Sequence, residues 1–236
     1  MNKNKIILYI VTITISISIF EIIKYSDKIN LYEINTFEIN GNKFLEKNEI
    51  KTIVQKSVKN LSYNLDISEI QKSLNNHSYI NESKVYSVLP SKIVITINEI
   101  IPIAIYENNN EIFFLDKNLN KIQANNKSIN YYSVPVITTL TNQINYKGIS
   151  NILTILKNKN QKFYSSINEL IIKEDIILIK IQNGTKIYIK KNKEINNTIK
   201  LLSFLNTIKN NKEITDYKYV DLTIPKQIIV KENKKI

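Results

Sequence analysis

The sequence predicts an α+β protein: a single N-terminal transmembrane helix, a small domain of order β-α-α-β-β, and a mainly antiparallel β domain with two helices. Three observations support this. An apolar run lies near the start, a mixed helical and alternating pattern covers residues 38–104, and short alternating segments dominate the remainder. A chain of 236 residues can hold one large domain or two small ones.

The apolar run extends from Ile6 to Ile23 and contains only one charged residue, Glu21. Eighteen helical residues span about 27 Å, the short end of a bilayer crossing. Lys3 and Lys5 precede the run and favour a cytoplasmic N-terminus. We therefore predict a cytoplasmic tail at residues 1–5, a transmembrane helix at residues 6–23 and a linker at residues 24–33.

A cleavable signal peptide is the alternative interpretation of this segment, since it also begins with positive charge and an apolar run. Residues 21–25 (Glu-Ile-Ile-Lys-Tyr) offer no small-x-small cleavage site. This absence favours an uncleaved anchor.

The first domain is predicted at residues 34–102 and opens with a strand that ends at Gly41-Asn42, where glycine permits positive φ. Residues 46–59 place apolar side chains at helical spacing: Ile50, Ile53, Val54 and Val58.

A second helix is predicted to start at Asp66, an N-cap with Glu69 three residues later, in a segment that begins at Asn64-Leu65. Its apolar face carries Ile67, Ile70 and Leu74. Two strands follow, one with Val85 and Val88 and one with Ile93, Ile95 and Ile97, joined by a turn at Leu89-Pro90-Ser91.

This stretch resembles a POTRA domain, and more narrowly that of FtsQ, a bacterial cell-division protein called DivIB in some species. The matching residues are Asn40-Gly41-Asn42, Glu49-Ile50, Asn64-Leu65-Asp66, Ile70, Leu74, Leu89-Pro90, Glu99 and Pro102-Ile103-Ala104. The chain departs from the family at Ile100, where an arginine is usual.

The second domain is predicted at residues 103–232, with a short tail at residues 233–236. Ile112–Leu115 forms a strand, residues 116–120 its turn, and Lys121-Ile122 starts the return strand. The family has a glycine where Asn120 stands, and asparagine also tolerates the left-handed conformation. Val134-Pro135-Val136-Ile137 matches a short Leu-Pro segment of the family.

Further elements follow from the apolar spacing. Helices are predicted through Ile149, Ile152, Leu153 and Leu156, and over Glu194–Lys209 through Ile195, Ile199, Leu202, Leu205 and Ile208. Asn183-Gly184 predicts a type I′ hairpin turn between two strands. Other strands are predicted at Ile167–Ile172, Asp175–Ile181, Thr185–Ile189, Tyr217–Ile224 and Gln227–Val230, the last two joined at Pro225-Lys226.

Tyr219-Val220-Asp221-Leu222 also matches the family, which usually has an arginine where Thr223 stands. The resemblance implies that partners of the FtsB and FtsL type add a strand to the edge of the C-terminal sheet. The residues expected to bind them are Thr223, Ile224, Lys226, Gln227, Ile228 and Val230. Alternatively, Ile228 and Val230 are only core residues of the sheet.

Nothing in the sequence indicates catalysis or ligand binding. There is no cysteine, one histidine (His77) and no glycine-rich phosphate loop. Turn and strand-end roles are expected for Glu99, Asp116, Asp175 and Asp221. The net charge of +12 comes from scattered lysines with no arginine, which disfavours nucleic-acid recognition. We expect no catalytic residue, metal, cofactor or small-molecule substrate.

The resemblance implies a non-enzymatic, single-pass scaffold of the inner membrane, with its bulk in the periplasm at the division septum, linking FtsB- and FtsL-type partners and other division proteins to septal peptidoglycan synthesis. The main alternative is a POTRA protein of outer-membrane assembly or secretion, which needs a cleaved signal and usually a large β-barrel. An unrecognised periplasmic enzyme is a third possibility.

Overall fold

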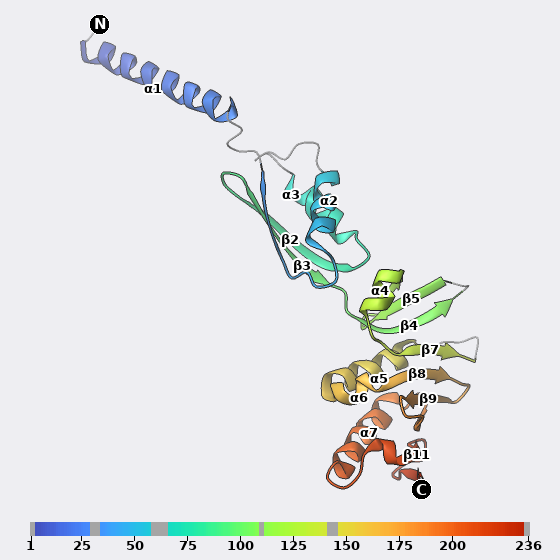
Figure 1. Cartoon of the computed structure of the whole chain (residues 1–236). Coiled ribbons are helices and arrows are strands. Elements are labelled where there is room, and N and C mark those ends of the chain that lie inside the picture. The colour runs from blue at the N-terminus through green and yellow to red at the C-terminus, as the bar shows by residue number, and fades with distance from the viewer. Residues whose placement is uncertain (1–2, 29–33, 58–65, 109–110, 141–145, 234–236) are drawn as a thin grey trace. The chain divides into compact units, whose positions relative to one another are not determined.

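The computed structural model describes residues 3–28, 34–57, 66–108, 111–140 and 146–233 (Figure 1). It has two compact units, residues 1–99 and 100–236. The predicted α+β class, with an N-terminal apolar helix ahead of mixed sheets, is confirmed. The predicted domain ranges meet between residues 102 and 103, whereas Pro102 pairs with Asp116 in the second sheet.

The N-terminal helix α1 covers Lys3–Lys28. Its segment Ile6–Tyr25 is long and apolar enough to cross a membrane, with a mean hydropathy of 2.4 and no buried side chain. Thr12 and Thr14 donate their hydroxyls to the carbonyls of Tyr9 and Val11, at 2.9 Å in both cases. These bonds satisfy the hydroxyls within the helix itself.

The first unit has the predicted β-α-α-β-β order. Its strands form a sheet of order β1-β3-β2, in which β1 is parallel to β3 and β2 antiparallel to it. The elements are β1 (Thr36–Asn40), α2 (Lys47–Ser57), α3 (Ile67–Asn75), β2 (Ile80–Val88) and β3 (Lys92–Glu99).

Helix α3 begins at the predicted cap. The Asp66 carboxylate accepts hydrogen bonds from the backbone N–H groups of Ser68 and Glu69, at 3.0 and 3.2 Å. Ile70 and Leu74 are fully buried, as are Ile50 and Val54 of α2. The predicted positions Val58, Asn64 and Leu65 lie outside the described residues.

Glu99, the last residue of β3, binds the loop that follows β1. Its carboxylate accepts hydrogen bonds from the backbone N–H groups of Lys43, Phe44 and Leu45, at 2.9–3.0 Å. In the same loop, Gly41 has a φ of +83° and approaches the backbone of Ile97 closely. The end of β3 therefore holds the loop through both a side chain and the main chain.

The second unit is built around a sheet of order β12-β11-β10-β9-β8-β7-β4-β5-β6. The pairs β4/β7, β7/β8 and β10/β11 are parallel and the others antiparallel. The elements are β4 (Pro102–Asn108), β5 (Glu111–Asp116), β6 (Lys121–Gln123), α4 (Asn126–Tyr131), β7 (Val136–Thr139), α5 (Tyr146–Lys159), α6 (Gln161–Ser165), β8 (Ile167–Ile172), β9 (Ile176–Ile181), β10 (Lys186–Lys190), α7 (Glu194–Ile208), a 3-10 turn η1 (Ile214–Asp216), β11 (Tyr217–Asp221) and β12 (Ile229–Glu232).

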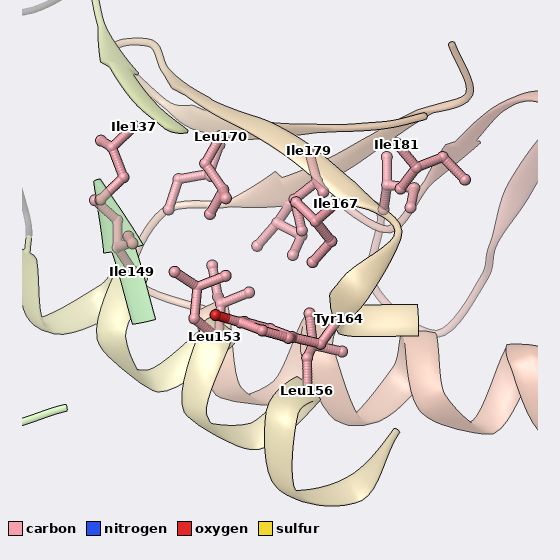
Figure 2. Close-up of a cluster of buried hydrophobic side chains, with 14 of the residues drawn as sticks. Ile137, Ile149, Leu153, Leu156, Tyr164, Ile167, Leu170, Ile179 and Ile181 are labelled. Carbon is pink, nitrogen blue, oxygen red and sulfur yellow. The ribbon is translucent and has the colours of Figure 1, made fainter. Parts of the chain in front are cut away.

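The core of this unit lies between α5 and the sheet (Figure 2). Ile149, Leu153 and Leu156 of α5 face Leu170 of β8 and Ile179 of β9, and all five are fully buried. Such packing is the main source of stability for a domain of this size.

Two polar groups hold the start of β4 over this core. Tyr164 donates its hydroxyl to the Ile103 carbonyl at 3.0 Å, and burial raises the pKa of Tyr164 to about 12. The Lys157 ammonium donates to the Pro102 carbonyl at 3.2 Å. Burial also lowers the pKa of Lys157. The first strand of the second unit is thereby fixed to α5 and α6.

Two predicted turns differ in detail. In the turn after β5 the residue with positive φ is Leu119 (70°) rather than Asn120, whose amide and backbone N–H groups instead bind the buried Asp116 carboxylate. In the turn after β9, Gly184 has a φ of +87° but Asn183 is not among the described residues with positive φ. A type I′ turn needs both, so that prediction is wrong.

The predicted apolar face of α7 is confirmed at Leu202, Leu205 and Ile208, which pack against the core, but it is wrong in the first half of the helix. Ile195 and Ile199 are about half exposed, whereas Asn197 and Thr198 are buried. The Asn197 side chain accepts the Lys190 N–H at 2.9 Å, and the Thr198 hydroxyl donates to the Glu194 carbonyl at 2.7 Å. Because these polar groups find partners inside, the helix turns them toward the sheet.

Three adjacent strands share a polar cluster. On β8, the Glu169 carboxylate accepts hydrogen bonds from the Thr138 hydroxyl of β7 at 2.6 Å and from the Lys180 ammonium of β9 at 2.9 Å. The hydrogen bond from Thr138, and after it the one from Lys180, lowers the pKa of Glu169 below its ordinary value of 4.5. The carboxylate therefore stabilises the fold above its unfolded pKa, and this contribution is lost as the pH falls through the folded pKa.

We expect Glu169→Gln to weaken the acid sensitivity of the second unit. Glutamine keeps an acceptor for the Thr138 hydroxyl but cannot titrate. The free energy of unfolding of the variant should therefore fall less between pH 7 and pH 3 than that of the wild type. Urea unfolding across this pH range measures the difference. Glu107→Gln, at an exposed position of β4, is the matched control. Parallel pH curves for the wild type and Glu169→Gln would contradict the prediction.

Candidate functional site

Strand β12 ends the nine-stranded sheet and offers its outer edge. It pairs with β11 on one side through Asp221 opposite Ile229 and Val220 opposite Val230. All four of its residues are exposed. An edge strand of this kind presents backbone N–H and C=O groups to which another strand can bond.

Strand β11 is positioned by a β-α-β unit made of β10, α7 and β11. The β10/β11 pairing is parallel and short, from Lys186 opposite Tyr219 to Tyr188 opposite Asp221. The buried Thr185 hydroxyl strengthens it by donating to the Tyr217 carbonyl at 2.7 Å. The position of β12 therefore depends on β11, which is held in place by α7 and by the end of the β9–β10 hairpin.

Lys200 of α7 holds the chain where it leaves β11. Its ammonium donates to the carbonyls of Leu222 and Ile224, at 3.2 and 2.7 Å. Burial lowers the pKa of Lys200, and the charge of Asp221 acts in the opposite direction. Lys200 carries no signal in the sequence, since one lysine among many on a helix predicts no particular contact.

Most of the predicted binding residues lie in the connection between β11 and β12 and not on a strand. β11 ends at Asp221 rather than Ile224, and β12 begins at Ile229 rather than Gln227, which corrects the predicted boundaries. The Asp221 carboxylate accepts hydrogen bonds from both the backbone N–H and the hydroxyl of Thr223, at 2.8 and 2.7 Å. This local pairing turns the chain out of the strand.

The other five predicted residues are divided between this connection and the strand. Ile224 and Gln227 are exposed, and Lys226 is held at a φ of 62°. Ile228 is half-buried and packs against the core, whereas Val230 lies on the edge strand with 37% of its surface exposed. Only Val230 of the six lies on β12 itself.

Strand β12 extends beyond the predicted strand to Lys231 and Glu232, and Ile229, which lies within the predicted strand, was not among the expected binding residues. Ile229 is 41% exposed and belongs to the apolar triplet Ile228-Ile229-Val230. Because all three residues are apolar, the sequence does not indicate which of them face the core, and two registers are equally compatible with it. The far end of the strand is tied down by an ion pair between Lys212 and Glu232, which raises the pKa of Lys212. The edge is thus held at both ends.

The remaining titratable candidates have structural roles. His77 is half-buried and accepts the Tyr79 N–H at 3.3 Å through Nδ1, and burial lowers its pKa against the opposing charge of Glu49. The carboxylates of Glu99, Asp116 and Asp221 bind nearby N–H groups. Within the described ranges no group of three or more His, Cys, Asp or Glu residues could hold a metal ion.

Comparison with known proteins supports the predicted family resemblance of the first unit. Residues 32–99 match the model of a family described as "POTRA domain, FtsQ-type". No curated protein matches the chain significantly.

One solved structure with a similar chain is the major extracytoplasmic domain of the trans isomer of the bacterial cell division protein DivIB from Geobacillus stearothermophilus. The two chains are 13% identical, the match covers 49% of this chain and 99% of that one, and the TM-score is 0.32. The family assignment therefore rests on residues 32–99. Residues 32–99 thus resemble a POTRA domain of the FtsQ type, which confirms the predicted resemblance to the FtsQ/DivIB family over this part of the chain.

Proposed function

We propose that this protein is a non-enzymatic, single-pass scaffold of the bacterial division machinery. It links FtsB- and FtsL-type partners to septal peptidoglycan synthesis. The FtsQ-type domain at residues 32–99 supports the division role. The apolar segment Ile6–Tyr25 supports a membrane anchor. The positive charges before it favour a cytoplasmic N-terminus, which puts the bulk of the chain in the periplasm at the septum.

The partner binds by adding a strand to β12. The observation that carries this proposal is the position of β12 at the end of its sheet with every residue exposed. Main-chain hydrogen bonds supply affinity in this mode, and alternate side chains supply specificity. Val230 and Ile229 offer apolar contacts on opposite faces of the strand, while Ile224, Lys226 and Gln227 flank it from the preceding connection.

Strand addition predicts that partner contact follows the edge and not the sheet as a whole. A photocrosslinking amino acid is placed at Val230, Ile229 or Lys121 in the full-length protein in dividing cells, and each adduct is identified by mass spectrometry. Lys121 lies on β6, the opposite edge of the same sheet, and is the matched control. We expect adducts with a small single-pass coiled-coil protein at Val230 and Ile229 but not at Lys121.

A second set of variants tests the main-chain contribution. Proline removes a backbone N–H and is tolerated in sheets essentially only at edges and bulges. Along β12 the N–H groups alternate between β11 and the open side, so one of Ile229→Pro and Val230→Pro should abolish the adduct while leaving the fold intact. Equal capture by all variants, or capture at Lys121 alone, would overturn the proposal.

A further inference from the structure

The hairpin that joins β2 and β3 ends in an exposed apolar tip, which we define as Tyr86, Val88 and Leu89. Their exposed fractions are 53%, 42% and 68%. Tyr86 and Val88 lie opposite Val94 and Lys92 on the face of the sheet that carries the Glu38–Lys92 ion pair. Three large apolar groups together at one turn need a reason, since single ones do not.

The tip lies at the end of the domain where the chain arrives from the membrane anchor. The backbone N–H groups of Asn35 and Thr36 donate to the Ser91 carbonyl, at 3.1 and 3.3 Å. Ser91 is two residues beyond Leu89 in the same turn. Helix α1 ends at Lys28, so residues 29–35 limit the distance from α1 to Asn35 to about 25 Å even when fully extended.

The chemistry of the hairpin suits a lipid surface. Residues 83–98 contain two lysines and no acidic residue, and Glu38 of β1 pairs with one of the two, Lys92. Tyrosine is enriched at membrane interfaces, where its ring lies among the headgroups, and lysine is attracted to anionic lipid. Three side chains are too few for a stable protein interface, which buries about 1,200–2,000 Å². A tether that keeps the tip near the bilayer compensates for weak intrinsic binding by raising its effective concentration.

We propose that the tip of Tyr86, Val88 and Leu89 inserts into the headgroup region of the membrane that holds α1. This inference rests on the proposed membrane anchor. It gives the POTRA domain a second attachment point beside its linker, which restricts rotation of the domain about the anchor. The three-stranded sheet would then stand with its hairpin end toward the bilayer.

The native chain has no cysteine, so single-cysteine labelling is unambiguous. Full-length Leu89→Cys, Asn81→Cys and Ile15→Cys proteins carry an environment-sensitive fluorophore in phosphatidylcholine vesicles containing phosphatidylglycerol, with or without a lipid whose acyl chain bears a quencher. Asn81 is exposed at the opposite end of the same strand, and Ile15 lies within the apolar span. We expect lipid quenching at positions 89 and 15 but not at position 81.

Two further variants separate the tip from the label. Adding Tyr86→Ser and Val88→Ser to Leu89→Cys should reduce the quenching at position 89, since both side chains are exposed and their loss leaves the core intact. Quenching at position 15 with none at position 89 would overturn this inference alone. Loss of quenching at position 15 would overturn the membrane anchor as well. A blue-shifted but unquenched label at position 89 would indicate burial against this chain or a second copy of it and would also overturn the inference.

Discussion

Replacement of Gly41 by alanine is expected to destabilise the POTRA domain by about 3–5 kcal/mol. The residue has a φ of +83°, and an added Cβ would overlap the carbonyl oxygen of Ile97 and lie 3.2 Å from its carbonyl carbon. The left-handed conformation costs about 1–2 kcal/mol for an L-residue. The overlap adds more because a backbone atom, unlike the end of a flexible side chain, moves only with its strand.

Gly184→Ala is the matched control. Gly184 has nearly the same φ, +87°, but nothing lies within 4 Å of an added Cβ. Only the conformational cost applies there, and alanine offsets part of it by restricting the unfolded chain, so we expect a loss of about 1 kcal/mol.

Hydrogen exchange on the full-length protein can resolve the two units. Exchange from β1 and β3 should accelerate about a hundredfold or more in Gly41→Ala, and exchange from β9 and β10 several-fold in Gly184→Ala. Similar accelerations in the two variants would show that the close approach to Ile97 is not what requires glycine.

Substitution of Glu99 by alanine should cost a comparable amount, about 3–5 kcal/mol. Its carboxylate is the acceptor for three backbone N–H groups of residues 43–45, and hydrogen bonds to a charged group contribute about 1.5–3 kcal/mol each, less than additively. The loop, and with it the start of α2, should lose protection from hydrogen exchange first.

Glu99→Gln should fall between the wild type and Glu99→Ala. Lys43 and Leu45 donate to Oε1 and Phe44 to Oε2, so glutamine can retain the first pair and places an NH₂ group against the N–H of Phe44. Glu82→Ala, at an exposed position of β2, is the control and should change stability by less than about 0.5 kcal/mol. Equal stability of all three Glu99 proteins would exclude the carboxylate as the clamp of this loop.

The POTRA domain could be predicted well from the sequence because the patterns that define its helices and turns each cover only a few residues. The Asp66 cap, the apolar positions Ile70 and Leu74 and the turn at Gly41 each act within a few residues, and all were found where expected. The role of Glu99 as a general strand-end residue was foreseen, but its three specific donors were not, because they lie 54–56 residues earlier in the chain.

The second unit was harder to predict because its order depends on distant pairings. The insertion of β7 between β4 and β8, both parallel to it, leaves no mark on local periodicity. At the candidate site, the apolar triplet Ile228-Ile229-Val230 fits two registers, and only the pairing with β11, which places Ile229 opposite Asp221, distinguishes them. On α7, buried hydrogen bonds of Asn197 and Thr198 outweighed the apolar spacing of Ile195 and Ile199.

The hydrogen bonds of Glu99 also constrain the order of folding during synthesis. Strand β1 is made early, but its partner in the sheet is β3, and the loop after β1 is closed by the final residue of that strand. Until residue 99 has been synthesised, β1 has no partner strand and Gly41 has no strand to approach. Closing so long a loop is entropically costly and slow. The sheet of this domain is therefore completed only after its last strand has been made, and the early strand β1 stays unpaired in the interval.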